Sequence, residues 1–202
     1  MTRAEFAARL KNACAAVTAA EAELTEIDSK FGDADHGLTM AKIAGAISEA
    51  VDAAEGGIQS MLDDAAMAVM TRNGGSAVPL WNTWLDGLQE EAPEGEEIDV
   101  AGLKAIFAKA LEELEDMSGA KVGDKTMMDA LIPASEAVAA YTGDSADELF
   151  DAAAQAAAQG AEATKQYVSK FGRAKSYGTK TIGTPDAGAV SMSWFFQGLA
   201  RE

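Results

Sequence analysis

The chain has 202 residues, 48% of them hydrophobic, so it can bury a substantial core and is not a disordered tail. A formal net charge of −17 argues against nucleic acid and against an anionic membrane as the main partner, because both are negatively charged. The only cysteine, Cys14, cannot form an internal disulfide, and neither a basic-then-apolar leader nor an apolar run of about 18 residues is present. We therefore expect a single cytoplasmic domain covering residues 1–202.

Apolar residues at helical spacing predict eight helices, and no stretch gives a convincing strand signal. A capping-box pattern at Thr2 and Glu5 opens the first helix, which we expect to run unbroken to Asp28. Connections are mostly short, which favours antiparallel neighbours in a bundle or a closed ring, so the expected fold class is all-α. The later helices are expected over about 38–51, 58–70, 79–88, 100–117, 127–140 with a bend near Pro133, 146–168 and 187–199.

The turn after the first helix crowds three carboxylates, Asp28, Asp33 and Asp35, next to the chain's only histidine, His36. Ionised carboxylates this close repel one another unless a cation lies between them, so the cluster predicts a site for a hard metal. The spacing excludes an EF-hand, because the twelfth residue counted from each aspartate is not a glutamate. All-carboxylate ligation favours Mg²⁺ over zinc. The alternatives are helix-capping or solvated aspartates and a hydrogen-bonded core histidine.

Four loops are rich in glycine or in basic residues: 28–36, 74–76, 119–126 and 171–186. Three of them lead directly into predicted helices, where backbone N–H groups favour phosphate binding. Neither a Walker A motif nor a Rossmann fingerprint is present, so a nucleotide would be held through metal. No acidic residue lies between Glu162 and Asp186, so the last loop is either a positive lid over phosphates or a basic surface loop. The basic residues in this interval are Lys165, Lys170, Arg173, Lys175 and Lys180.

Four motifs resemble the ADP-binding L subunit of dihydroxyacetone kinases, in order and over nearly the whole chain. They are G-D-A-D-H-G-L at 32–38, G-D-K-T-M at 123–127, G-R-A at 172–174 and I-G-T-P-D-A-G-A at 182–189. The resemblance implies an eight-helix antiparallel barrel with the nucleotide site formed by loops at one end. It also implies ADP or ATP and two Mg²⁺ ions as cofactors.

The same resemblance implies roles for individual residues. Asp28, Asp33 and Asp35 match metal ligands. Arg173 and His36 match positions at the reacting phosphates, where Mg²⁺ and Arg173 would screen the γ-phosphoryl oxygens. The nucleotide-contacting positions that it implies are His36, Gly37, Leu38, Thr39, Gly75, Ser76, Ala77, Gly119, Met127, Arg173, Asp186, Ala187 and Gly188.

Partners are implied by the resemblance as well. A short ketose such as dihydroxyacetone is held covalently by a histidine of a separate K subunit, so this chain would supply the nucleotide half. In phosphotransferase-linked members, ADP stays bound and is rephosphorylated by a phosphoryl-carrier M subunit, whereas other members use exchangeable ATP. A homodimer is left open.

Two departures from the family pattern occur. The family usually reads Gly-Gly-Ala-Ser-Gly where this chain has Gly-Gly-Ser-Ala-Val at 74–78, and Asp-Pro-Gly where it has Asp-Ala-Gly at 186–188. The first change is expected to alter the direction of the Ser76 side chain or to narrow the phosphate-binding loop. A tetrulose such as erythrulose is therefore an alternative substrate. Two other functions stay open: a nucleotide-loaded module that regulates a partner protein, and an acidic helical domain that binds Ca²⁺ or Mg²⁺ structurally.

Overall fold

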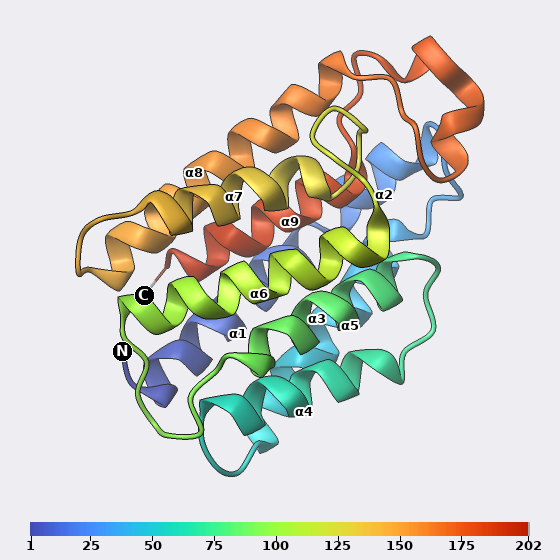
Figure 1. Ribbon diagram of the computed structural model, residues 1–202. Helices are drawn as coiled ribbons and strands as arrows, with labels where there is room; N and C mark the ends of the chain where they lie inside the picture. Colours follow the sequence, from blue (N-terminus) through green and yellow to red (C-terminus); the bar gives the residue numbers. More distant parts are fainter. Residues whose placement is uncertain (202) are drawn as a thin grey trace.

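The computed structural model describes residues 1–201, which fold into α-helices joined by loops (Figure 1). This confirms the all-α prediction. No helix in this range is both long and apolar enough to cross a membrane. The α-helices are α1 (Arg3–Ala19), α2 (Glu21–Ser29), α3 (His36–Ala53), α4 (Ile58–Met70), α5 (Ala77–Glu90), α6 (Val100–Ser118), α7 (Met128–Ala140), α8 (Ala146–Ala163) and α9 (Ala187–Leu199), and two 3-10 helices, η1 (Thr164–Gln166) and η2 (Arg173–Thr181), lie between α8 and α9.

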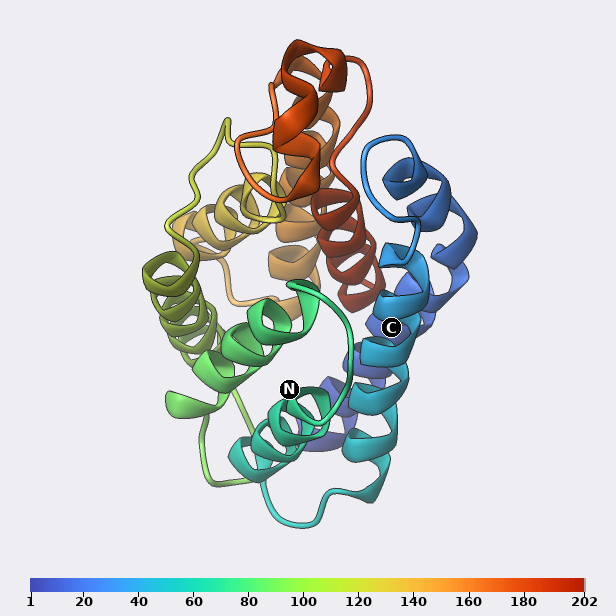
Figure 2. The same ribbon diagram turned by 90° about the vertical axis from the view of Figure 1, so that its right-hand side faces the viewer.

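The helices form a closed antiparallel ring, which is seen from one end in Figure 2. From α3 to α9 each helix packs against the next, α3 also packs against α1, and contact between α9 and α1 closes the ring. Helix α2 lies at the end of α1 and packs on α3 and α9. If α1 and α2 are taken as one member, the ring is the predicted eight-helix barrel.

The predicted first helix is interrupted at Ala20, whose ψ of 2° departs from helical geometry. No glycine or proline marks the break in the sequence. The cause is tertiary: Leu24 is fully buried, and Trp194 Nε1 of α9 donates to the Glu23 carboxylate at 2.9 Å, so α2 follows α3 and α9 rather than the axis of α1. Periodicity alone does not register such a change of direction.

Helix α8 also ends earlier than predicted, at Ala163 instead of Val168. The Thr164 hydroxyl donates to the Ala161 carbonyl, and the chain continues as the 3-10 turn η1. The N-terminal cap predicted at Thr2 is confirmed, because its side chain accepts the backbone N–H of Glu5, and Asp99 and Ser145 cap α6 and α8 in the same way. Pro133 lies inside α7.

Aromatic side chains fill the interior of the ring. Trp81 and Trp84 of α5 stack edge-on with their ring centroids 5.6 Å apart, and Phe195 of α9 lies 5.1 Å from Trp81 and 5.4 Å from Trp84. Phe107 and Phe196 extend the cluster to α6 and to the next position of α9. Edge-to-face pairs each add roughly 0.5–1.5 kcal/mol beyond area burial, so this cluster ties opposite sides of the barrel together.

Glycines permit close approach where helices cross. A Cβ on Gly198 of α9 would lie 2.3 Å from the Ala13 Cα of α1, at the contact that closes the ring. A Cβ on Gly87 of α5 would lie 2.6 Å from the Ala110 Cα of α6. The obstructing atoms are backbone, which cannot rotate away, so these positions accept only glycine without a shift of the helices.

We expect Gly198→Ala to lower the free energy of unfolding by about 1–3 kcal/mol, because the added methyl group pushes α9 off α1. The matched control is Gly45→Ala in α3, where an added Cβ meets nothing within 4 Å. This change should be stabilising by about 0.4–1 kcal/mol through helix propensity. Urea unfolding followed by circular dichroism measures both variants, and equal stability of the two would contradict the packing argument.

Candidate functional site

Four helices, α3, α5, α7 and α9, begin at the same end of the barrel, which faces the viewer in Figure 2. Their first turns line a pocket of about 600 Å³ together with the end of α2 and the loop before η2. Trp81 of the aromatic cluster is also in the lining. Helix N-termini present free N–H groups and the positive end of the helix dipole, so this pocket favours an anion.

The three predicted metal ligands converge at the edge of this pocket. Asp28 lies in the last turn of α2, Asp33 in the turn that follows, and Asp35 immediately before α3. One ligand atom from each lies within 4.8 Å of the others. The Asp28 Oδ2 atom also accepts the backbone N–H of Asp35 at 3.1 Å and that of His36 at 3.4 Å, which fixes the turn.

The electrostatics of the carboxylate cluster favour a cation. Burial and then the negative charge of Asp33 raise the pKa of the Asp35 carboxyl, with a smaller contribution from Asp28. Arg173 forms an ion pair with Asp33 and partly offsets the repulsion. Three convergent carboxylates that repel one another are a donor set suited to a hard divalent ion such as Mg²⁺.

His36 is the first residue of α3 and connects it to α9. Its Nε2 atom lies 3.3 Å from the Ser191 hydroxyl, which itself donates to the Gly188 carbonyl at 2.8 Å. Burial lowers the pKa of His36, although the nearby Asp28 charge opposes this. The imidazole is therefore neutral at neutral pH and holds the first turn of α9, and its predicted phosphate contact stays a prediction.

Most of the predicted nucleotide-contacting residues line the pocket, and three do not. Gly37 packs beneath α2, where a Cβ would lie 2.1 Å from the Glu21 carbonyl oxygen. Leu38 is 50% exposed, and Gly119 ends α6 in the left-handed conformation. Contact of these three with a nucleotide stays a prediction. The lining includes His36, Thr39, Gly75, Ser76, Ala77, Met127, Arg173, Asp186, Ala187 and Gly188.

The loop at 74–78 departs from the family pattern, and the structure places its side chains. Ser76 precedes α5 and lines the pocket, and its hydroxyl makes no capping hydrogen bond. Val78, which stands where the family usually has glycine, is buried and is not part of the pocket lining. Its side chain therefore adds to the core and does not narrow the pocket.

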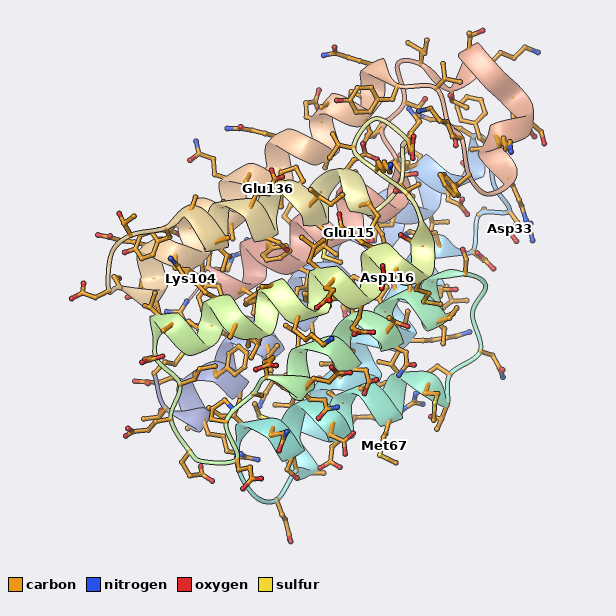
Figure 3. The ribbon with its side chains drawn as sticks, in the orientation of Figure 1. Asp33, Met67, Lys104, Glu115, Asp116 and Glu136 are labelled. Carbon is orange, nitrogen blue, oxygen red and sulfur yellow. The ribbon has the colours of Figure 1, made fainter. Side chains whose placement is uncertain are left out.

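Residues 171–186, which we call the lid segment, cover one side of the pocket. Besides the Arg173–Asp33 ion pair, the rings of Phe31 and Tyr177 lie 5.1 Å apart, so two contacts join the lid segment to the turn that carries the carboxylates. In Figure 3, Asp33 is seen next to this segment. Phe31, Asp33 and Arg173 also line the pocket, so both contacts lie at its edge, next to the carboxylate cluster.

Comparison with known proteins identifies the family. A model of the DAK2 domain matches residues 30–201. This chain belongs to the DAK2 family. The match includes the carboxylates at Asp33 and Asp35, all four helices that begin at the pocket, and the lid segment.

Several proteins resemble this DAK2 domain over most of its length. It is 36% identical to the L-erythrulose kinase of Pectobacterium atrosepticum over 96% of this chain and 34% of that protein. It is also 36% identical to the D-erythrulose kinase of Mycolicibacterium smegmatis, over 94% of this chain and 34% of that protein. The ADP-binding subunit of the PEP-dependent dihydroxyacetone kinase of Escherichia coli is 29% identical over 93% of this chain and 91% of that protein. The chain thus spans about a third of the erythrulose kinases.

Among solved structures, the dihydroxyacetone kinase from C. freundii in complex with AMP-PNP and Mg²⁺ superimposes with a TM-score of 0.73 at 24% identity. The match covers 98% of this chain and 33% of that one. This likeness shows that the DAK2 domain and a region of that kinase share a fold.

Two buried charged residues, Lys125 in the pocket lining and Asp129 in the first turn of α7, were not predicted as site residues from the sequence. Lys125 and Asp129 are only 4% and 1% exposed. Asp129 accepts the backbone N–H groups of Gly123 at 2.6 Å and Thr126 at 2.7 Å, and so shapes the loop before α7. The available signal was the spacing of Thr126 and Asp129, which matches a capping pattern. No signal in the sequence marked Lys125 as buried.

Asp186 caps α9 by accepting the Ala189 backbone N–H at 2.8 Å. Burial, with a smaller contribution from the Asp129 charge, raises the pKa of Asp186 to about 7, and the Lys125 ammonium opposes the shift. Because this pKa is above the ordinary value of 3.8, the folded protein binds more protons than the unfolded chain between these pH values. The contribution of Asp186 to stability therefore falls as pH rises through this window and is lowest above about pH 7.

We expect Asp186→Asn, which keeps the cap but does not titrate, to become progressively more stable relative to the natural protein as pH rises from about 5 to about 8. The control is Asp99→Asn at the exposed cap of α6, which accepts the Gly102 N–H at 2.7 Å. Thermal melting across this pH range measures the difference for each variant. A difference that does not change with pH for Asp186→Asn would refute the shifted pKa.

Proposed function

We propose that this chain is the nucleotide-binding part of a kinase that phosphorylates dihydroxyacetone or a related short ketose. It binds ADP or ATP through Mg²⁺, and the ketose is held by a separate K subunit. The observation that carries this proposal is the meeting of three carboxylates within 4.8 Å of one another and four helix N-termini at one pocket. Carboxylates suit Mg²⁺ and helix N-termini suit phosphates, so the combination fits a metal-bound nucleotide. The pocket volume, about 600 Å³, is in the range of small-molecule sites.

In this proposal Asp28, Asp33 and Asp35 hold two Mg²⁺ ions, which would neutralise the phosphate oxygens when bound. The first turns of α5, α7 and α9 orient the phosphates with their backbone N–H groups. Arg173 lies at the pocket mouth, where its guanidinium can stabilise the negative charge of the transferred phosphoryl group. Phosphoryl transfer depends mainly on positioning and charge neutralisation, so the chain needs no strong base of its own.

Exposed apolar side chains around the pocket support docking of a K subunit or K domain. We call this set the apolar rim, and it comes from the start of α3, the ends of α4 and α6, the loop before α7 and the lid segment. Apolar surface gathered at the mouth of a site favours a protein partner. The relatives with erythrulose kinase activity are about three times longer than this chain, so they carry further sequence beside the matching region. The apolar rim consists of Leu38, Met70, Met117, Val122, Phe171, Tyr177 and Ile182.

The ketose is proposed to be dihydroxyacetone, with erythrulose as the alternative. Relatives named for the PEP-dependent dihydroxyacetone kinase match at 29% identity, and relatives named for erythrulose kinases at 36%. The phosphoryl donor is either ATP or a phosphorylated M subunit that recharges bound ADP. A reconstituted assay with each ketose and each donor separates these cases, and a homodimer and a cytoplasmic location stay predictions.

A regulatory module that only carries a nucleotide is the second candidate, and the apolar rim would then bind a regulator. It predicts no ketose phosphorylation when the chain is combined with a K subunit. A purely structural metal site predicts a protein that binds Mg²⁺ but no ADP. Calorimetry with ADP, followed by the reconstituted assay, distinguishes all three functions.

We expect Asp33→Ala to weaken ADP binding in the presence of Mg²⁺ by more than about 100-fold, because one carboxylate of the metal cluster is lost. The helical circular dichroism signal should be unchanged, since Asp33 is exposed in a turn. Asp116→Ala, an exposed position on α6, is the control and should bind ADP normally. Natural ADP affinity in the Asp33 variant would rule out the proposed metal site.

We expect Val122→Glu to reduce ketose phosphorylation in the reconstituted assay by at least about tenfold while ADP affinity stays unchanged. The reason is that a charge at this position of the apolar rim opposes docking of the K subunit. The control is Met67→Glu, which also replaces an exposed apolar side chain by glutamate, at a position that is 55% exposed on α4 and outside the apolar rim. Equal activity of the two variants would show that the apolar rim is not the docking surface.

A further inference from the structure

Lys125 lies in the loop between α6 and α7, and its buried side chain reaches under the lid segment. Its Nζ atom donates to the carbonyl oxygens of Thr164 at 2.7 Å, Thr181 at 2.9 Å and Thr184 at 2.5 Å. A lysine ammonium has three hydrogens, so these carbonyls fill its hydrogen-bonding capacity. One charged group thus joins the end of α8 to two positions near the end of the lid segment.

The acceptors of Lys125 belong to a compact base where the chain enters and leaves the lid segment. Gly183 donates its backbone N–H to the Lys165 carbonyl at 2.7 Å, and Ser169 donates to the Thr181 hydroxyl at 3.1 Å. Thr164 and Thr181 are fully buried. The lid segment therefore has a buried base, held by Lys125, and an exposed tip that carries Arg173 and Tyr177.

A buried ammonium is costly unless opposite charge and hydrogen bonds compensate for the loss of water. Burial lowers the pKa of Lys125, while the carboxylates of Asp186 and Asp129 oppose the shift. The backbone of Lys125 also adopts a left-handed conformation, with φ of 62°. A non-glycine residue in that region costs about 1–2 kcal/mol, so this lysine is held in place by the contacts of its side chain.

We propose that Lys125 is a positioning residue of the nucleotide site. Its ammonium fixes the base of the lid segment, and this sets where Arg173 and the turn from Asp186 to Gly188 lie relative to the phosphates. Only the part of this inference that concerns phosphates rests on the proposed function. The link between Lys125 and the lid segment does not, because it can be measured without a nucleotide. It does not require Lys125 to touch the nucleotide.

The first test compares Lys125→Met, which keeps the length and apolar stem of the side chain, with Lys121→Met, an exposed lysine of the same loop. In the absence of nucleotide, backbone hydrogen exchange across residues 165–185 should become faster in the Lys125 variant. In the control it should have the same rate as in the natural protein. Unchanged exchange in this region overturns the inference. If Lys125→Met loses its helical signal, Lys125→Arg takes its place, because a planar guanidinium keeps the charge but cannot point three hydrogens at the same carbonyls.

The second test asks whether Lys125 acts through Arg173. ADP affinity in the presence of Mg²⁺ should fall on the order of tenfold in Lys125→Met, as for other residues that orient binding groups. In a double-mutant cycle, Arg173→Ala should cost less affinity in the Lys125→Met background than in the natural protein. Fully additive losses, which a general loss of stability would give, overturn the positioning role.

The two proposals fail in different ways. If the natural protein binds no ADP, the proposed function is wrong, and the exchange experiment still decides whether Lys125 holds the lid segment. If the natural protein binds ADP and the Lys125 variant binds it equally well, the positioning role is wrong and the proposed function stands.

Discussion

The site depends on the antiparallel closure of the helical ring. Because each helix from α3 onward reverses the direction of its neighbour, and α9 packs back on α1, the first turns of α3, α5, α7 and α9 meet at one end. Each N-terminus carries a partial positive charge of roughly half a unit. The net charge of −17 repels anions from the chain as a whole. The helix dipoles and a few basic residues make the pocket locally favourable for an anion.

The carboxylates at the pocket edge balance that environment. Asp28 belongs both to the turn and to the carboxylate cluster, since its Oδ2 atom accepts two backbone N–H groups while its carboxylate lies among the three that converge. Asp35 is left in a repulsive field, and Arg173 approaches Asp33 from the lid segment. The site therefore has carboxylates suited to a cation at its edge and positive helix N-termini inside. A metal-bound phosphate would match both, because it carries both kinds of charge.

Periodicity and capping patterns were enough to predict the helices, because an amphipathic helix buried on one side shows its register in the sequence. The carboxylate cluster was also predictable, since its members are within eight residues of one another. The break at Ala20 was not, because it depends on the packing of α2 against two distant helices. Lys125 was missed for the same reason: its three acceptors lie 39 to 59 residues away. At Val78 the sequence suggested a change in the pocket that the structure does not show. Val78 departs from the family motif, but its side chain is buried in the core.

The lid segment is held unequally along its length. At its base, Thr164, Thr181 and Lys125 are buried and hydrogen-bonded, so opening there would expose unsatisfied polar groups. At its tip, the Arg173 side chain is 69% exposed, and an exposed ion pair contributes only about 0–1 kcal/mol. The tilted contact between the rings of Phe31 and Tyr177 is the other contact at the tip. The tip can therefore open at low free-energy cost while the base stays closed. Opening of the tip is then limited by the contacts of Phe31 and Asp33 with it, while the buried base sets the position to which the tip returns.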